Sequence, residues 1–237
     1  MQVSHVNQDI SLDNVVPFFQ PIMDLRHNSV WRYECLARLI NFEQAAFVPS
    51  EFLYLVARRH SVARLTQTIF NRSANYFRNL NVAWSVNVSL EDMLDPDIPL
   101  FLRAQLLHYP NPQRISLEIT VNNALQHTAA FHDFVNLCRS LQLSITLDHF
   151  DLVNSDLEQV LALPVDAIKI SANVLQALED NRDLSALLKH FCQQAELRNI
   201  TLVAEHIEQV NVLEAMQQYG FRYAQGFYLS APKAQLE

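Results

Sequence analysis

Residues 115–150 read ISLEITVNNALQHTAAFHDFVNLCRSLQLSITLDHF and contain two predicted strands on either side of a predicted helix. The runs ISLEIT (115–120) and SITLDHF (144–150) are short, apolar and rich in β-branched residues, which is typical of buried strands. Between them, AFHDFVNLCRSL (130–141) has apolar residues three and four positions apart, as in an amphipathic helix. A strand, a helix and a second strand in this order predict two parallel strands of one sheet.

The same alternation continues along the rest of the chain. Further strands are predicted at VVPFFQPIMDL (15–25), VWRYECLARL (30–39), VAWSVNV (82–88), DAIKIS (166–171), ITLVAE (200–205) and YAQGFYL (223–229). Helical spacing is found at residues 52–77, 98–107, 158–163, 184–197 and 210–219. About eight strands in 237 residues, half of them hydrophobic, favour one (β/α)8 barrel over an open doubly wound sheet. We therefore expect a single domain over 1–237, with 1–14 as a peripheral N-terminal segment.

A polar side chain stands at or near the end of most predicted strands. These residues are Glu34, Asn87, Glu118, Asp148, Lys169, Glu205 and Gln225. A carboxylate among apolar strand residues costs several kcal/mol unless it is paired or bound to a metal. In a barrel, the carboxyl ends of the strands converge on one face, where active sites lie. The repeated occurrence of polar residues at the strand ends therefore predicts a functional site at that face.

The chemistry of this set favours a hard cation. Carboxylates and an amide oxygen are ligands that select Mg²⁺ or Mn²⁺ over zinc. Lys169 permits a second interpretation, in which a barrel lysine forms a Schiff base with a carbonyl substrate. Neighbouring carboxylates favour its charged form and raise the lysine pKa, so a role in orienting water or stabilising charge is favoured.

Composition excludes several other classes of protein. The net charge is −8, whereas proteins that bind DNA or RNA polymers are usually basic. The two glycines provide neither a P-loop nor a GxGxxG dinucleotide loop. No apolar run approaches the roughly 18 residues that span a bilayer, and the N-terminus does not resemble a signal peptide. Three dispersed cysteines are expected to be buried thiols, so we expect a cytoplasmic protein without membrane insertion.

An ordered set of motifs resembles the EAL domain, the cyclic di-GMP phosphodiesterase family of bacteria. In YECLARL (33–39), Cys35 replaces the alanine of the motif that names the family. The remaining matches, in order, are FFQPIMDL (18–25), FVPSEFLYLVARR (47–59), SVNVS (85–89), LEIT (117–120), LDHF (147–150), LPVDAIKIS (163–171), VAEHIE (203–208) and QGFYLSAP (225–232). The resemblance covers nearly the whole chain and implies a modified TIM barrel of the EAL type.

The resemblance also implies roles for individual residues. It implies one Mg²⁺ or Mn²⁺ held by Glu34, Asn87, Glu118 and Asp148, with His149 as a weak candidate ligand for a second ion. It implies that Lys169 and Glu205 position or activate the attacking water. It further implies that cyclic di-GMP contacts Gln20, Arg38, Glu208 and Gln225.

Several positions depart from the family pattern. The family has Asp-Asp-Phe-Gly-Thr-Gly where residues 148–153 read Asp-His-Phe-Asp-Leu-Val, so His149 replaces an acid that helps to bind the second metal. A neutral imidazole is a poor ligand for Mg²⁺, and we interpret His149 as a neutral residue hydrogen-bonded at the barrel rim. Val121 replaces an acid that anchors a catalytic loop in the family, and His206 and Ser171 replace a glycine and an aspartate.

These departures leave three interpretations. The favoured one is a domain that binds cyclic di-GMP and hydrolyses it to linear pGpG weakly or not at all. The alternatives are a fully active phosphodiesterase and an adaptor that acts through protein contacts without the nucleotide. The resemblance also implies a protein partner and a homodimer, although Val121 alters the loop that helps to form the family's dimer.

Overall fold

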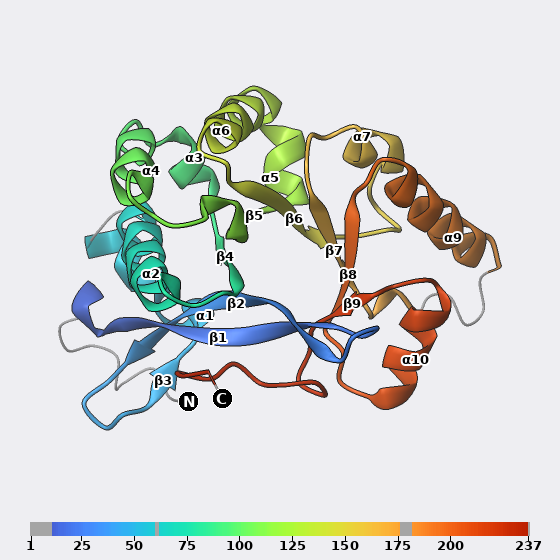
Figure 1. Ribbon diagram of the computed structural model, residues 1–237, viewed down its shortest axis with the longest axis horizontal. Coiled ribbons are helices and arrows are strands. Elements are labelled where there is room, and N and C mark those ends of the chain that lie inside the picture. The colour runs from blue at the N-terminus through green and yellow to red at the C-terminus, as the bar shows by residue number, and fades with distance from the viewer. Residues whose placement is uncertain (1–10, 60–61, 176–181, 237) are drawn as a thin grey trace.

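The protein folds as a closed barrel of strands surrounded by helices (Figure 1). The computed structural model describes residues 11–59, 62–175 and 182–236. The strands are β1 (Val15–Asp24), β2 (Ser29–Ile40), β3 (Ala46–Phe47), β4 (Ala83–Asn87), β5 (Ile115–Thr120), β6 (Ser144–Phe150), β7 (Ala167–Ser171), β8 (Thr201–Glu205) and β9 (Tyr223–Ala224). Their order in the sheet is β1-β9-β8-β7-β6-β5-β4-β2-β3, and pairing of β1 with β2 closes the barrel. This arrangement confirms the predicted modified TIM barrel.

The first strand is antiparallel to both of its neighbours, whereas β2 and β4 to β9 form parallel pairs in succession. β1 and β2 form a hairpin whose turn spans residues 25–28. Asp24 stabilises the turn because its Oδ1 accepts hydrogen bonds from the backbone nitrogens of Arg26 and His27, at 3.0 and 3.4 Å. Asn28 completes the turn with a left-handed φ of 47°, which asparagine tolerates better than most residues. β3 is a short addition to the outer edge of β2.

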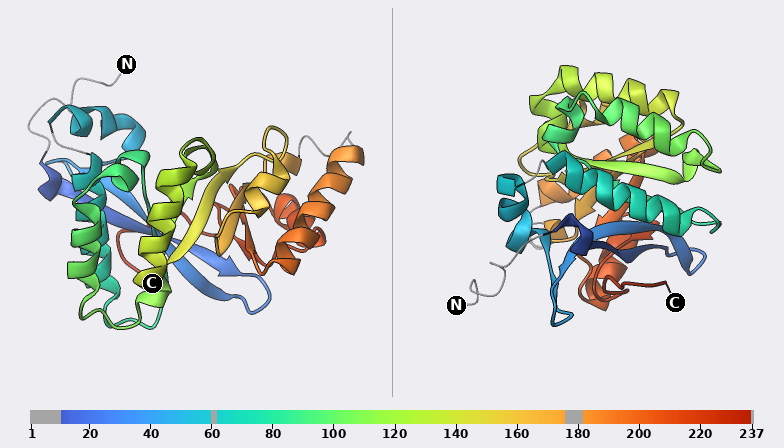
Figure 2. Two further views of the ribbon diagram at one scale, coloured as in Figure 1. Left: turned by 90° about the horizontal axis from the view of Figure 1, so that it is seen from above. Right: turned by 90° about the vertical axis from the view of Figure 1, so that its left-hand side faces the viewer.

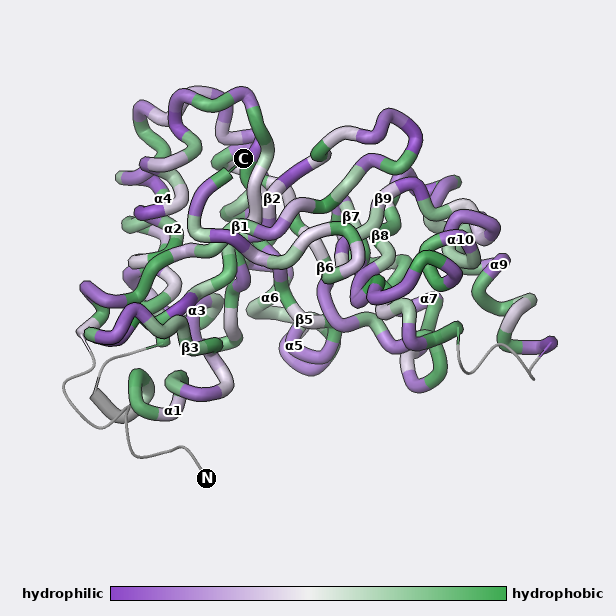
Figure 3. The backbone as a smooth tube through the Cα atoms, turned by 90° about the horizontal axis from the view of Figure 1, so that it is seen from below, coloured by the Kyte–Doolittle hydropathy of each residue, from purple (hydrophilic) through white to green (hydrophobic). Residues whose placement is uncertain are grey.

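Helices cover the outside of the barrel (Figure 2). They are α1 (Pro49–Arg59), α2 (Val62–Phe77), α3 (Leu90–Leu94), α4 (Ile98–Leu106), α5 (Val121–Gln126), α6 (Thr128–Ser140), α7 (Leu157–Leu161), α9 (Arg182–Leu197) and α10 (Val210–Gln218), with 3-10 turns at Leu12–Asn14 and Pro112–Arg114. On α2, Phe70 and Phe77 are buried and pack on Trp84 of β4, with ring centroids 5.4 and 5.9 Å apart. Apolar residues follow the strands and the inward sides of the helices (Figure 3).

Some details differ from the sequence-based expectations, among them the predicted strand 223–229, of which β9 contains only Tyr223–Ala224. Residues 52–77, predicted as one helical segment, belong to two helices, α1 and α2. Cys35 and Cys138 are buried as expected, but Cys192 on α9 is only half-buried because it faces a hollow beside the start of β8. Of the segment 1–14, residues 1–10 lie outside the described residues. No helix in the described part of the chain is long and apolar enough to span a membrane.

Candidate functional site

Four carboxylates converge on the ammonium group of Lys169 at the carboxyl ends of the strands. Lys169 Nζ lies 2.9 Å from Glu34 Oε2 and 2.9 Å from Glu118 Oε2. It also lies 3.6 Å from Asp148 Oδ1 and 3.8 Å from Glu205 Oε2. All five residues are buried, and each is at most 6% exposed. The structure therefore brings together the acids and the lysine that the strand ends predict.

Burial and mutual repulsion set the charges in this cluster. Burial raises the pKa of Glu118 and of Glu205 to about 7, since each carboxylate is taken out of water beside other acids. For Glu34, burial acts in the same direction, but the Lys169 ammonium outweighs it and lowers the pKa. Burial alone would lower the Lys169 pKa, yet Glu118 and Glu34 raise it well above its ordinary value. A lysine held in its charged form is unsuited to Schiff-base formation, so the geometry favours a charge-stabilising role.

Amide side chains complete the hydrogen bonding of Glu34. Asn87 Nδ2 donates to Glu34 Oε1 at 2.8 Å, and Gln225 Nε2 donates to Glu34 Oε2 at 2.7 Å. Gln225 Nε2 also lies 3.2 Å from Gln20 Oε1, while Gln20 Nε2 donates to the Ser230 carbonyl at 3.0 Å. This network joins β1 and β2 to the segment after β9, and it fixes the orientation of Glu34.

His149 lies at the rim and is tied to Asp148. Its Nδ1 is 2.9 Å from Asp148 Oδ2, and its backbone nitrogen donates to Asp148 Oδ1 at 2.9 Å. The hydrogen bond to Asp148 raises the His149 pKa to about 9, so the imidazole is charged at neutral pH. The rim position and the hydrogen bond agree with the sequence-based interpretation. The neutral state assigned there was wrong, because a carboxylate at this distance favours the imidazolium.

The loop after β6 is anchored by an apolar side chain. Leu152 is 2% exposed and belongs to the same buried core as Val121, the first residue of α5, which is 4% exposed. Asp151 Oδ1 caps the turn by accepting a hydrogen bond from the Val153 nitrogen at 2.9 Å. Burial of Leu152 therefore holds this loop, which lacks the family's glycines.

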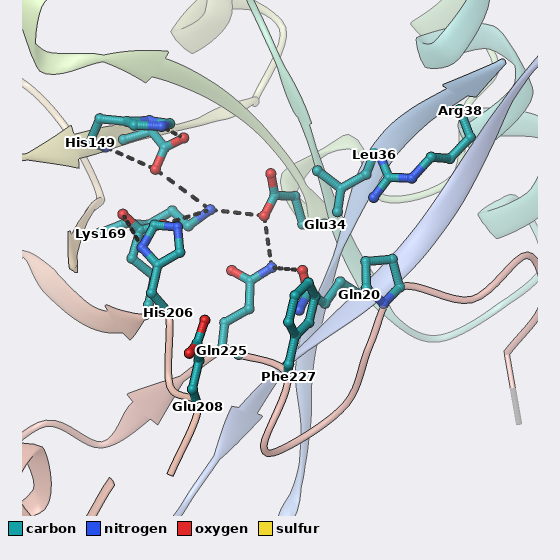
Figure 4. A pocket seen from close by; sticks show the side chains of 14 residues that line it. Gln20, Glu34, Leu36, Arg38, His149, Lys169, His206, Glu208, Gln225 and Phe227 are labelled. Atoms are coloured by element: carbon teal, nitrogen blue, oxygen red, sulfur yellow. Dashed lines mark hydrogen bonds and ion pairs between the residues drawn. The ribbon is translucent and has the colours of Figure 1, made fainter. Parts of the chain in front are cut away.

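These side chains border a cavity of about 270 Å³ (Figure 4). Its walls include the sequence-predicted ligand residues Gln20, Arg38, Glu208 and Gln225. The Arg38 guanidinium is half-buried and donates to the Ala37 carbonyl at 2.8 Å. Asn87 does not line the cavity, but it donates a hydrogen bond to Glu34, which does.

Sequence reasoning did not identify five further wall residues as part of the site: Leu36, His206, Gly226, Phe227 and Pro232. Phe227 is 68% exposed and lines the rim of the cavity. The adjacent Gly226 could have indicated this part of the site, because the chain has only two glycines. A Cβ on Gly226 would lie 2.1 Å from the Ile207 carbonyl oxygen, so only glycine lets the segment before Phe227 approach the segment after β8 this closely.

The donors fit a hard divalent cation in chemical type, although they are not preassembled around one. In the described part of the chain, no three His, Cys, Asp or Glu side chains are grouped as a metal site. Buried oxygens of two acids, Glu118 Oε1 and Glu205 Oε1, nevertheless have no hydrogen-bond partner there. A cation among these oxygens would compensate the deficit. The sequence-predicted ligands Glu34, Asn87, Glu118 and Asp148 are the residues that would hold it.

Comparisons with known proteins agree with this architecture. The solved structure of the PaMucR phosphodiesterase in complex with c-di-GMP superposes on this chain with a TM-score of 0.83 at 21% identity, covering 98% of both chains. The FimX EAL domain from Pseudomonas aeruginosa bound to c-di-GMP gives a TM-score of 0.82 at 22% identity, covering 95% of this chain and 93% of that one. At these identities, the likeness shows a shared fold.

Curated relatives cover most of this chain. The cyclic di-GMP phosphodiesterase PdeA of Borreliella burgdorferi is 21% identical over 97% of this chain and 35% of its own length. The probable cyclic di-GMP phosphodiesterase PdeB of Escherichia coli is 28% identical over 90% of this chain and 41% of its own length. This chain thus spans well under half of these relatives. The model of the EAL domain matches residues 4–232, and the chain therefore belongs to the EAL domain family.

Proposed function

We propose that this protein binds cyclic di-GMP and hydrolyses it weakly or not at all. The observation that carries the proposal is the contact between His149 and Asp148, which commits both Asp148 oxygens to donors of the protein itself. A positively charged imidazole beside Asp148 also disfavours a dication there. The nucleotide-binding half of the proposal is supported by Gln20, Arg38 and Gln225 in the cavity wall.

Each of these residues has a separate role in the proposed hydrolysis of a phosphodiester bond. A divalent cation, when bound, would lower the pKa of water and neutralise the phosphate charge. Glu205 lines the cavity, and its proposed role is to orient a water and to receive its proton. Lys169 and Arg38 supply positive charge toward the phosphodiester.

One assay distinguishes binding from hydrolysis. The protein is incubated with cyclic di-GMP and either Mg²⁺ or Mn²⁺, linear pGpG is followed by chromatography, and affinity for the intact nucleotide is measured by calorimetry. We expect binding with little linear product. Rapid turnover with Mg²⁺ that Glu205→Gln abolishes would establish an active phosphodiesterase, and a lack of binding would favour the protein-contact adaptor.

The fully active phosphodiesterase remains the second candidate because of the two buried oxygens without partners, Glu118 Oε1 and Glu205 Oε1. A metal titration tests the site itself. Mn²⁺ binding followed by electron paramagnetic resonance should be weakened in Glu34→Ala, since Glu34 is the acid that the amides orient. Equal binding by the variant and the wild type would exclude Glu34 as a ligand.

A further inference from the structure

A hollow of about 680 Å³ opens at the amino ends of the strands, opposite to the candidate functional site. It lies between α9, the end of α10 and the first residues of β8 and β9, and both helices are at the right of Figure 1. Thr201, which begins β8, lines the hollow, whereas Glu205, which ends β8, lines the site cavity. Four residue steps along a strand span about 13 Å, so the length of β8 separates the two cavities. The hollow is therefore not an extension of the site.

The side chains around the hollow carry more positive than negative charge. Among the described residues that line it are three cations, Arg26, Lys189 and Arg222, and a single acid, Glu196. Within the part of the chain that the structure describes, neither Arg26 nor Lys189 forms an ion pair or a side-chain hydrogen bond. The excess is local, since the chain as a whole has a net charge of −8. These two cations add no ion pair to the fold, and they are available to an anion that enters the hollow.

The third cation, Arg222, is held in place by contacts on two sides. Its Nε donates a hydrogen bond to Asp24 Oδ1 at 3.0 Å, and its Cζ lies 5.0 Å from the centroid of the Tyr223 ring. Tyr223 in turn stacks on Trp31, with ring centroids 4.4 Å apart. A wall fixed in this way loses little conformational entropy when a ligand binds. Asp24 offsets part of the Arg222 charge, so the two unpaired cations supply most of the attraction for an anion.

The rest of the lining is suited to an organic group. It includes the ring of Tyr219 and the apolar side chains of Ile200 and Leu202. Lys189 Nζ lies 6.0 Å from the centroid of the Tyr219 ring, so positive charge and aromatic surface adjoin each other. The volume falls within the roughly 300–1,000 Å³ of pockets that enclose small organic ligands. An inorganic phosphate ion would leave most of this space unfilled.

We propose that this hollow binds a planar phosphate monoester of the nucleoside monophosphate class. Arg26 and Lys189 contact the phosphate, because guanidinium and ammonium groups both form charge-assisted hydrogen bonds with phosphate oxygens. The planar group lies against Tyr219 and the apolar residues, since aromatic side chains stack on bases of any sequence. The proposal does not depend on binding of cyclic di-GMP at the other end of the barrel.

Cys192 lines the hollow and reports on its occupancy. Cys35 and Cys138 are buried, so alkylation of the folded protein should modify Cys192 first. Burial raises the pKa of Cys192 to about 11, and the reaction with iodoacetamide is therefore run at alkaline pH. Mass spectrometry of the Cys192 peptide follows the rate at increasing concentrations of AMP. We expect AMP to slow the modification, and adenosine or inorganic phosphate to slow it much less.

Variants at exposed positions change the charge of the hollow in opposite directions. Arg26→Gln with Lys189→Gln should raise the AMP concentration for half-maximal protection by about tenfold or more, because two charge-assisted contacts are lost. Glu196→Gln should lower that concentration severalfold, since it removes the acid that repels the phosphate. Arg103→Gln removes an exposed cation of α4 and should match the wild type.

The outcomes separate this site from the proposed function. No protection of Cys192 by AMP, or the same half-maximal concentration in the wild type and the double variant, would overturn the site. Equal protection by adenosine would overturn the role of the phosphate, and equal protection by inorganic phosphate that of the planar group. Calorimetry should show the same affinity for cyclic di-GMP in the wild type and the double variant. A loss of that affinity would contradict a separate site at the amino ends of the strands.

Discussion

The Nδ1 atom of His149 lies 2.9 Å from Oδ2 of Asp148, at the carboxyl end of β6. The backbone nitrogen of His149 holds the other oxygen of the same carboxylate. One residue of the protein thus supplies two donors and a positive charge to an acid that the family pattern assigns to a metal. His149 thus supplies hydrogen bonds to both oxygens of Asp148, next to the acids that surround Lys169.

Replacing His149 with Asp should increase hydrolysis of cyclic di-GMP in the presence of Mg²⁺. The change removes the imidazolium and adds a carboxylate, which strengthens attraction for a divalent ion. His149→Asn is the matched control, because asparagine also tolerates the left-handed φ of 58° but adds no charge. Linear product is measured for all three proteins at saturating Mg²⁺. Equal rates in the aspartate and asparagine variants would show that charge at this position does not limit the reaction.

Arg38→Ala should weaken binding of cyclic di-GMP by about tenfold to over a hundredfold. A charge-assisted hydrogen bond typically contributes about 1.5–3 kcal/mol, and Arg38 is a half-buried cation in the cavity wall. Arg103→Ala removes an exposed arginine of α4 and should leave the affinity unchanged. Calorimetry at fixed ionic strength measures both. If the two variants lose affinity to the same small extent, Arg38 contributes only to the overall charge.

Lys169→Met should destabilise the protein by about 3–5 kcal/mol at neutral pH without metal. Removing one partner of a buried ion pair leaves uncompensated charge, and four acids surround this lysine. Mn²⁺ should restore part of the lost stability, because a cation can replace the ammonium among the carboxylates. Lys189→Met, at an exposed position of α9, provides the control.

Unfolding in urea with and without Mn²⁺ gives the comparison. Unchanged stability of Lys169→Met in the absence of metal would contradict the view that the ammonium neutralises the cluster.

Acid should weaken the seam between β1 and β9 through Asp24. Asp24 accepts a hydrogen bond from Arg222 Nε at 3.0 Å and lies 2.8 Å from His27 Nδ1. The hydrogen bond from Arg222 holds the Asp24 pKa below its ordinary value. The resulting stabilisation is present above about pH 4, the ordinary pKa range of aspartate, and is lost as the pH falls further.

The difference in free energy of unfolding between the wild type and Asp24→Asn should therefore be constant from pH 7 to about pH 5 and begin to narrow as the pH falls below about 4. Glu43→Gln, at an exposed turn position, should follow the wild type throughout. A constant difference between the wild type and Asp24→Asn across this range would show that ionisation of Asp24 contributes nothing to the seam.

Sequence patterns were sufficient for most strands and for the convergence of their polar ends. β5 and β6 have the predicted bounds because β-branched runs there are flanked by clear helical spacing. Strand periodicity does not show that β1 is antiparallel to β2, but the length of the connection between the two strands does. The connection spans only residues 25–28, and parallel strands require a crossover of a dozen or more residues.

Other features depend on distances that no sequence pattern contains. The position of Lys169 among four acids follows from the radius of the barrel, since the participating strands are far apart in the chain. The charge of His149 follows from its contact with Asp148, and adjacency in sequence does not ensure a hydrogen bond.

The antiparallel first strand has a consequence for the order of folding. β1 can pair with β2 at once through a short turn, but its second partner, β9, is about 200 positions away, and such distant contacts form slowly because loop closure is entropically costly. Gln20 lies on β1 and Gln225 directly follows β9, so their hydrogen bond forms only with this late pairing. The cavity that Gln20 and Gln225 border would thus be completed only when the barrel closes. A partly folded intermediate would hold a core of parallel strands around an incomplete cavity.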